Sequence, residues 1–281
     1  MEQKLYTKPA EFLAENQDFL LANEALVQLN YGNAAAHRDE NCHPGLFFGR
    51  YEENGEMCLL FGNTAPWNIC LNAPQEAAAS MQAVKELAQY LQEENIDISG
   101  ITARKDLADA FMQAYGGAFK LWASMDIMVL RKVIAPPPVP GQLRQATLSD
   151  QDFVLAGICG FMKDIHDEDT QPADHKERWL PRLEAGKIYL WEQPDGTIVS
   201  MAGTVRPLEH GETISAVYTP PQYRGKGYCQ NTVAAICQEK LREGKEYCTL
   251  FVDKKNPISN RVYQKIGFEI KENCYEYKLV E

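Results

Sequence analysis

The pattern of apolar and polar positions divides the first half of the chain into strands and amphipathic helices. Residues 45–62 predict two strands joined at Glu53–Asn54–Gly55, because Asn-Gly supplies the positive φ of a tight hairpin. Residues 76–93 predict a helix, since their apolar positions recur every three or four residues. These positions are Met81, Val84, Leu87, Ala88 and Leu91. Residues 97–103, 105–117 and 121–133 then predict a strand, a helix ending at glycine and a strand.

The second half repeats this order. The predicted elements are a short strand at 143–147, a helix at 149–162 capped by Ser149 or Asp150, a helical piece at 178–185 stopped by Gly186, a hairpin at 187–207 turned at Pro194–Asp195–Gly196, a strand at 211–219, a helix at 228–243, a strand at 247–252, a helix at 257–266 stopped by Gly267, and strands at 268–270 and 274–280. The shared order suggests an ancient duplication, although the two halves share no residue-level repeat.

A proline-rich segment separates the halves. Residues 135–141, Ala-Pro-Pro-Pro-Val-Pro-Gly, favour an extended spacer because proline excludes helix and central strand. We therefore expect two domains, at residues 1–134 and 142–281, joined by this linker. A chain of 281 residues is long enough for each half to bury its own core.

Composition narrows the class of protein. The chain is 45% hydrophobic and 24% charged, which is ordinary for a globular protein, and it contains no apolar run of about 20 residues. Its start does not resemble a signal peptide, so we expect a cytoplasmic protein with no membrane partner. A net charge of −11 argues against nucleic acid as a partner and mildly favours a cationic substrate.

The cysteines do not predict a metal site. All eight are scattered without a Cys-x-x-Cys pair, which is typical of reduced and mostly buried thiols. Cys42 stands beside His43, but adjacent residues seldom build a tetrahedral site alone. We expect no metal.

A glycine turn between a predicted strand and a predicted helix suits an anion. Gly225 and Gly227 permit positive φ, so successive backbone N–H groups can point into one concavity at the start of a helix. Arg224 and Lys226 add charge-assisted contacts, and a pyrophosphate fits this description. The spacing matches neither the Walker pattern nor Gly-x-Gly-x-x-Gly, because Tyr228 follows the lysine and glycine pair and Gln230 stands at the third glycine position. A simple loop with solvated cations is the alternative.

A second motif lies downstream. Asn256 is a predicted N-cap, Pro257 the first helical residue and Gly267 the stop of a short helix that follows a strand. Asn260 and Tyr263 occupy neighbouring faces of this helix and could reach toward a groove. For Tyr263 alone, the alternative is a core aromatic whose hydroxyl is hydrogen-bonded.

Together the two motifs resemble the GNAT superfamily of acyl-coenzyme-A-dependent N-acetyltransferases over residues 142–281. The Q/R-x-x-G-x-G/A signature is matched by Gln222, Gly225 and Gly227, and the later N-x-x-x-Y-x-x-x-G-F pattern by Asn260, Tyr263, Gly267 and Phe268, with Asn256 preceding it. The resemblance implies an α/β (α+β) fold of tandem GNAT-like domains. Each would be a mixed, mostly antiparallel twisted sheet flanked by helices, with splayed central strands in the C-terminal domain.

The resemblance also implies a mechanism. Acetyl-CoA would be the cosubstrate, held by Val217, Tyr218, Thr219, Gln222, Arg224, Gly225, Lys226, Gly227, Tyr228, Asn256, Asn260 and Tyr263. A backbone N–H near Val217 or Tyr218 would polarise the thioester carbonyl, and an amine would attack directly. Tyr263 would meet the departing thiolate. Glu212 is one candidate base, Glu209 and His210 are others, and an ordered water competes with all three.

The acceptor is left open. It would be a small-molecule amine, a peptide N-terminus or a protein lysine, and residues 161–182 would carry the specificity. Residues 1–134 are interpreted as a degenerate copy of the fold, because the segment after their predicted strand, 68–80, has neither glycine nor cation; an unrelated packing domain is the alternative. A coenzyme-A-binding regulator or scaffold without catalysis is the rival function, and the oligomeric state is open.

Overall fold

The computed structural model describes residues 1–74, 78–206 and 208–280. Its first half contains β1 (Glu2–Leu5), α1 (Pro9–Glu15), α2 (Gln17–Ala22), α3 (Gln28–Ala36), β2 (Leu46–Glu53), β3 (Glu56–Thr64), β4 (Ile69–Asn72), α4 (Ala78–Glu93), β5 (Gly100–Ala103), α5 (Lys105–Tyr115) and β6 (Ala118–Leu130). The second half contains β7 (Gln142–Gln145), α6 (Gln151–His166), α7 (Pro172–Glu184), β8 (Ile188–Glu192), β9 (Ile198–Val205), β10 (Gly211–Tyr218), α8 (Tyr228–Arg242), β11 (Tyr247–Asp253), α9 (Pro257–Lys265) and β12 (Glu269–Val280). Short 3₁₀ turns lie at Leu148–Asp150 and Pro221–Tyr223.

The chain forms two compact units whose limits differ from the expected domains. One unit consists of residues 1–127 and 271–281, and the other of residues 128–270. The C-terminal strand was expected in the second domain, but Tyr275–Lys278 of β12 pair antiparallel with Gly100–Ala103 of β5. These backbone hydrogen bonds place the end of the chain in the N-terminal unit, so the expected limits of 134 and 142–281 do not describe the compact units.

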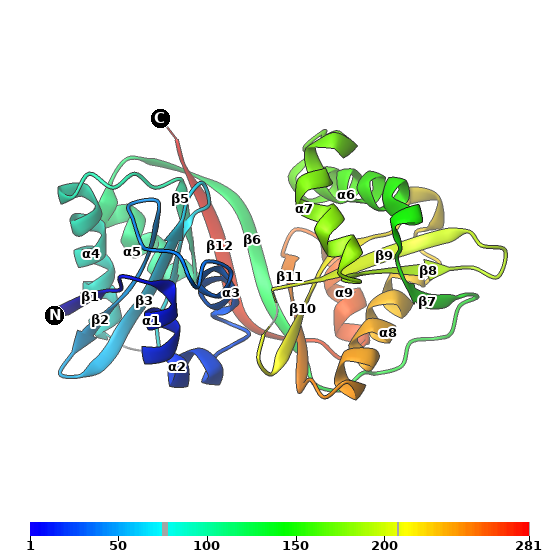
Figure 1. Ribbon diagram of the computed structural model, residues 1–281, viewed down its shortest axis with the longest axis horizontal. Coiled ribbons are helices and arrows are strands. Elements are labelled where there is room, and N and C mark those ends of the chain that lie inside the picture. Colours follow the sequence, from blue (N-terminus) through cyan, green and yellow to red (C-terminus); the bar gives the residue numbers. More distant parts are fainter. Residues whose placement is uncertain (75–77, 207, 281) are drawn as a thin grey trace. The chain divides into compact units, whose positions relative to one another are not determined.

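The N-terminal unit is a mixed sheet in the strand order β1-β2-β3-β4-β5-β12-β6. Most neighbours are antiparallel, whereas β4 and β5 run parallel. Its larger core cluster packs α4 and α5 on one set of strand residues, and α1–α3 cover another set around Phe12 and Phe48. This strand and helix order repeats that of the second unit, which supports the interpretation of a shared plan (Figure 1).

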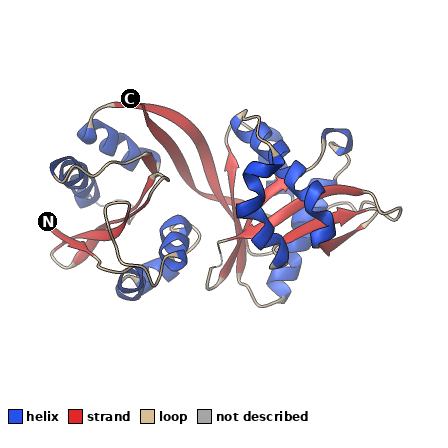
Figure 2. Ribbon diagram, turned by 45° about the horizontal axis from the view of Figure 1, so that its top comes forward, coloured by secondary structure: helices blue, strands red, loops and turns tan. Residues whose placement is uncertain are grey.

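The C-terminal unit is a mixed sheet in which β11, β10, β9, β8 and β7 are successive neighbours. Only β10 and β11 are parallel in this series. Helices cover both faces (Figure 2). Ile214 of β10 packs with α8 and α9 in one core cluster, whereas Ala216 packs with α6 and α7 in another. The expected fold class, with helices flanking mostly antiparallel twisted sheets, is confirmed.

The proline-rich segment, residues 135–141, forms neither helix nor strand, and it packs on the C-terminal unit. The Asn231 side chain of α8 donates a hydrogen bond to the Pro137 carbonyl at 3.0 Å, and the Trp191 indole donates one to Pro140 at 2.8 Å. The backbone N–H of Ile134 bonds the Ile266 carbonyl at 2.9 Å. Residues 135–141 are therefore part of the second unit.

Most predicted elements are found close to their expected positions. The hairpin turn has Asn54 and Gly55 at φ of 55° and 81°, and Asn256 caps α9 by accepting from the Ser259 N–H. Residues 76–77 of the predicted helix at 76–93, and Pro207 of the predicted hairpin, lie outside the described residues. Three features differ from the prediction. Helix α7 begins earlier, at Pro172, and the two predicted final strands form one strand, β12. A capping box of Thr147 and Asp150 precedes α6. None of the described helices is long and apolar enough to span a bilayer.

Candidate active site

The two parallel strands of the C-terminal unit separate part-way along their length. Gly211–Thr213 of β10 pair with Tyr247–Thr249 of β11, and the register between them ends there among the described residues. Both strands continue, β10 to Tyr218 and β11 to Asp253. In a continuous parallel ladder, the backbone N–H and C=O groups of β10 after Thr213 would pair with β11. Because β11 does not pair with them, they can form hydrogen bonds with another extended molecule. The expected splay of the central strands is confirmed.

A β-bulge lies in the separated part of β10. The pairing with β9 shifts between Ser215 and Tyr218, so that one extra residue is inserted. Ala216 has a φ of 51° and is fully buried. An alanine in this left-handed region costs on the order of 1 kcal/mol, which surrounding packing must offset, and such strain is typical of functional sites. The bulge re-aims the backbone N–H groups near Val217 and Tyr218.

The glycine turn opens the helix that follows. Gly225 has a φ of 76° and Gly227, the N-cap of α8, has a φ of 87°. A Cβ at Gly225 would meet no atom within 4 Å, so the backbone there is open to an approaching group. No side chain caps α8 at Gly227, which leaves the first N–H groups of a 15-residue helix without a side-chain acceptor. The turn has the geometry of an anion cradle.

The side chains around this turn are differently engaged. Arg224 donates to the Thr219 carbonyl at 2.8 Å and pairs with Asp164 of α6 at 2.6 Å, so its guanidinium faces α6. Lys226 lies over the Tyr223 ring, and Gln222 is exposed. The Tyr228 hydroxyl bonds Gln193 in the direction of the β8–β9 hairpin. The Tyr228 ring packs in a buried cluster with Trp191 and Val199.

The end of β10 is held by polar contacts with β9. The Thr219 hydroxyl donates to Ser200 at 2.9 Å, and the Ser200 hydroxyl donates to the Tyr218 carbonyl at 3.3 Å. The Tyr218 ring packs on α6, where a Cβ at Gly160 would come within 2.3 Å of it. Val217 is half-buried. These contacts fix the strand just before the glycine turn.

Tyr263 lies against α8. Its ring is 7% exposed and belongs to the core cluster that contains Val233, Ile236 and Cys237. Burial raises the pKa of its phenol well above the usual value, and the proximity of Cys229 and Cys237 raises the pKa further. Cys229 is in the first turn of α8. Tyr263 therefore lies near the N-terminal end of α8, which is the end next to the glycine turn.

The two asparagines of the later motif are used locally. Asn256 accepts from the Ser259 N–H at 3.0 Å, which caps α9. The Asn260 amide donates to the carbonyls of Asp253 and Asn256, both at 2.9 Å. These bonds join the end of β11 to the start of α9, and in this arrangement both side chains support the site rather than face it.

Glu212 is separated from these groups. It lies in the paired part of β10, four residues before Ala216, which corresponds to about 13 Å along a strand. The side chain is buried, and this burial raises the pKa of its carboxyl, while Lys187, Lys245 and Lys240 oppose the shift. The other base candidates, Glu209 and His210, precede Glu212 at the same end of the strand, where their carbonyls accept from Lys245 and Glu246.

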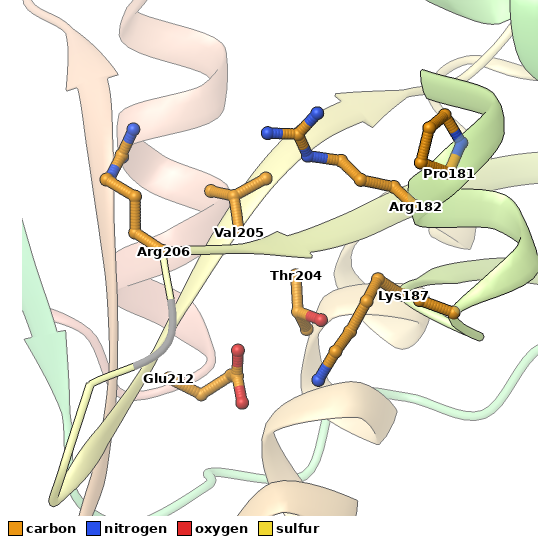
Figure 3. A pocket seen from close by; sticks show the side chains of 8 residues that line it. Pro181, Arg182, Lys187, Thr204, Val205, Arg206 and Glu212 are labelled. Carbon is orange, nitrogen blue, oxygen red and sulfur yellow. The ribbon is translucent and has the colours of Figure 1, made fainter. Parts of the chain in front are cut away.

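Sequence reasoning missed the cavity around Glu212. Pro181, Arg182, Ala185, Lys187, Thr204, Val205, Arg206 and Glu212 line a cavity of about 300 Å³ (Figure 3). Its residues come from the end of α7, the segment between α7 and β8, the end of β9 with Arg206, and the start of β10, which no local motif connects. Elsewhere, residues 1–74, 78–206 and 208–280 contain no cluster of three or more His, Cys, Asp or Glu side chains able to hold a metal ion.

Comparisons with known proteins agree with this geometry. Residues 195–277 match the family model "FR47-like protein". The fold is similar to a GNAT-family acetyltransferase from Colwellia psychrerythraea, with a TM-score of 0.60, 9% identity and coverage of 100% of both chains. It is also similar to a GCN5-related N-acetyltransferase from Sphaerobacter thermophilus, with a TM-score of 0.62, 14% identity and coverage of 98% of this chain and 94% of the other.

A tandem GNAT protein from the clavulanic acid biosynthesis pathway shares the fold at a TM-score of 0.56 and 11% identity, with 98% of each chain covered. No curated protein matches the sequence. At these identities the similarity concerns the fold. The resemblance to the GNAT superfamily is confirmed at that level, over both units.

Proposed function

Because the chain has the tandem GNAT fold, we propose that it transfers an acetyl group from acetyl-CoA to a primary amine, which attacks the thioester directly. The acceptor would be a small-molecule amine, a peptide N-terminus or a lysine. One observation carries the proposal: a single strand, β10, leaves its parallel partner after Thr213, bulges at Ala216 and leads into the open turn at Gly225. This arrangement provides both an extended backbone and an anion cradle along one path.

The cofactor would lie along this path. Its pyrophosphate would accept hydrogen bonds from backbone N–H groups between Gly225 and Tyr228, supported by the N-terminal dipole of α8. Its pantetheine amides would pair with Val217 to Thr219, where β11 no longer does. Arg224 would contact the phosphates only by leaving Asp164. Because the exposed ion pair of Arg224 and Asp164 contributes about 1 kcal/mol or less, breaking it to bind the phosphates costs little free energy.

The reacting groups would be the bulge and Tyr263. A backbone N–H near Val217 or Tyr218 would stabilise the tetrahedral oxyanion, a contact typically worth about 3–4 kcal/mol. A phenol with a raised pKa stays protonated at neutral pH, so Tyr263 would donate a hydrogen bond to the departing thiolate rather than transfer its proton fully.

Glu212 can act as the base only if ordered water molecules carry the proton to it from the amine. About 13 Å of strand separates it from the bulge, which is too far for direct proton transfer from the amine. A buried carboxyl with a raised pKa is a suitable terminal acceptor for a proton relayed by ordered waters. The same separation favours a second candidate function, a coenzyme-A-binding regulator that transfers nothing.

Valine at Gly225 tests the cradle. Gly225→Val should weaken acetyl-CoA binding at least about tenfold, because a branched side chain would occupy the open concavity and disfavour the positive φ. Isothermal titration calorimetry measures the affinity. Gly244→Val is the matched control, since Gly244 also has a positive φ, of 100°, with nothing within 4 Å, but follows the far end of α8. Equal affinity in wild type and Gly225→Val would remove the pyrophosphate assignment.

Thiol release separates the enzyme from the regulator. Wild-type protein with acetyl-CoA and a panel of amines, polyamines, amino sugars and peptides should release free coenzyme A with at least one acceptor. Acetyl-CoA binding without turnover on any of them would favour the regulator.

The N-terminal unit is proposed to be a degenerate copy that binds no acyl-CoA. It repeats the parallel strand pair, β4 and β5, but the segment after β4 contains no glycine. Without glycine, a backbone concavity of this kind is strained.

A further inference from the structure

Two buried hydroxyls join β9 to the end of β10. Ser200 of β9 is 0% exposed, as are its neighbours Val199 and Met201, and Thr219 is 9% exposed. The Thr219 hydroxyl donates to the Ser200 hydroxyl at 2.9 Å, which donates in turn to the Tyr218 carbonyl at 3.3 Å. The three groups therefore form one chain of hydrogen bonds that ends on the backbone of β10.

Stability alone does not account for a serine at this buried position. A buried hydroxyl exchanges its bonds to water for bonds to protein, so its net contribution is small, and an apolar pair of the same shape can be equally stable. The hydrogen bonds add direction instead. A bond from a hydroxyl to a carbonyl favours one orientation of the peptide group, whereas apolar contacts are not directional.

These bonds fix the edge of β10 that the Tyr218 carbonyl faces. The sheet order places β9 and β11 on opposite edges of β10. Tyr218 pairs with Met201 of β9, and its carbonyl accepts from Ser200 of the same strand. The Tyr218 carbonyl therefore faces β9.

The adjacent backbone groups face the other edge. In an extended chain, the N–H and C=O groups of one residue point to one edge and those of the next residue point to the opposite edge. Those of Val217 and Thr219 therefore face the edge that β11 leaves unpaired after Thr213. The Thr219 carbonyl agrees with this orientation, since it accepts from Arg224 of the glycine turn at 2.8 Å.

The bulge makes this orientation depend on an anchor. The β9–β10 register shifts between Ser215 and Tyr218. A further slip by one residue would turn the groups of Val217 toward β9 and those of Tyr218 toward the open edge. In the part of the chain that the structure describes, Tyr218 with Met201 is the one register position after the bulge. The hydrogen bond from Ser200 is a second tie at this point.

We infer that Ser200 is a positioning residue for the acyl donor. It touches no reacting group and acts through the Tyr218 carbonyl, which keeps the backbone of Val217 and Thr219 turned toward the open edge. The Thr219 hydroxyl orients the Ser200 hydroxyl by donating to its oxygen. The inference rests on the proposed function, in which the pantetheine arm and the thioester lie along this edge. It selects the N–H of Val217, not that of Tyr218, as the one that faces the thioester.

Two ligands that differ by the pantetheine arm test the inference. Coenzyme A carries the arm, whereas 3′-phosphoadenosine 5′-diphosphate carries the pyrophosphate without it. Ser200→Ala should weaken coenzyme A binding about three- to tenfold, the effect of one hydrogen bond, and should change nucleotide binding less than about twofold. Isothermal titration calorimetry measures both affinities. Equal weakening of the two ligands, or unaltered coenzyme A affinity, would overturn the inference.

Thr204→Val is the matched control. Thr204 is a buried residue of the same strand, and its hydroxyl forms no hydrogen bond with any described residue. Its removal should leave both affinities unchanged. A selective loss of coenzyme A binding in Thr204→Val would show that any buried change in β9 has this effect, and would contradict a specific role of Ser200.

Thr219 provides a second pair of variants. Thr219→Val removes the hydroxyl at nearly constant shape and should weaken coenzyme A binding selectively, whereas Thr219→Ser keeps the hydroxyl and should bind like wild type. Because both hydroxyls belong to one chain of hydrogen bonds, the double variant Ser200→Ala/Thr219→Val should lose no more than Ser200→Ala alone. Fully additive losses would contradict the chain. This pair also keeps the inference testable if Ser200→Ala fails to fold.

The same measurements separate this inference from the proposed function. Coenzyme A binding without acetyl transfer to any acceptor would remove the transferase proposal and leave the role of Ser200 to be decided by the affinities. Nucleotide binding that the pantetheine arm does not strengthen in wild type would overturn the role of Ser200 and leave the anion cradle intact. Absence of both ligands from the wild-type protein would overturn both proposals.

Discussion

At the scale of single residues, burial decides what the ionisable groups can do. From the sequence, Tyr263 is either a core aromatic or a group that meets the leaving thiolate. The structure buries its ring beside α8, and the contact with the thiolate stays a prediction. Glu212 is also buried, but it lies at the paired end of β10, away from the bulge. Equal burial therefore leads to different proposed roles, because the position along the strand differs.

Removing the phenol tests the role of Tyr263. Tyr263→Phe should lower kcat about 10- to 100-fold, which is the effect of losing one hydrogen bond to a charged group, and should change acetyl-CoA affinity much less. Steady-state kinetics and calorimetry measure the two effects. Tyr189→Phe is the control, since Tyr189 is a buried tyrosine of the same core cluster. An equal loss in kcat and affinity would assign Tyr263 to packing.

At the scale of elements, local patterns predicted where helices and strands occur and long-range contacts set their ends. The cap of α9 and the hairpin turn at Asn54–Gly55 follow from residue types at fixed offsets, and the structure confirms both. The start of α6 is more elaborate than predicted. Arg144 of β7 donates to both carboxylate oxygens of Asp150, at 2.8 and 2.9 Å, and the Thr147 N–H donates to the same carboxylate at 2.8 Å.

Asp150 should make the stability of this junction depend on pH. Arg144, followed by the Thr147 hydrogen bonds against the opposing effect of burial, lowers the pKa of Asp150 to about 2. The carboxyl of an unfolded chain has a pKa of about 3.9, so the stabilisation is complete above that pH and is lost as the pH falls from about 4 to 2.

Asp150→Asn should therefore cost about 2 kcal/mol of unfolding free energy at pH 7 and little near pH 2. Urea denaturation at the two pH values measures the difference. Asp152→Asn, in the exposed first turn of α6, should have a small effect at both. A cost for Asp150→Asn that is independent of pH would contradict the ion-pair explanation.

At the scale of the whole molecule, the last strand belongs to the first unit. Tyr277 is part of the N-terminal core, and the Asn68 amide donates to its carbonyl at 3.3 Å. The Lys278 amine donates to Asn68 at 3.0 Å. The N-terminal unit is therefore completed only after residues 128–270, which form the second unit, have been made.

Deletion of residues 271–281 should destabilise the N-terminal unit selectively. Hydrogen exchange followed by mass spectrometry should show loss of protection in β5, which would lose its antiparallel partner, while β8 and β9 remain protected. Deletion of residues 1–5, which removes the exposed edge strand β1, is the control and should have a smaller effect. Equal protection of β5 with and without the C-terminal strand would contradict the division into units.

The sequence by itself determined the order of strands and helices, the glycine turn and the Asn–Tyr motif, because these depend on periodicity and on residues a few positions apart. The tertiary structure decided three further features: the place of β12 in the N-terminal unit, the pairing of Arg224 with Asp164, and the cavity that joins α7 to the start of β10. Each depends on residues brought together from distant parts of the chain, and no local spacing encodes which distant partner a strand edge or a charged side chain will meet.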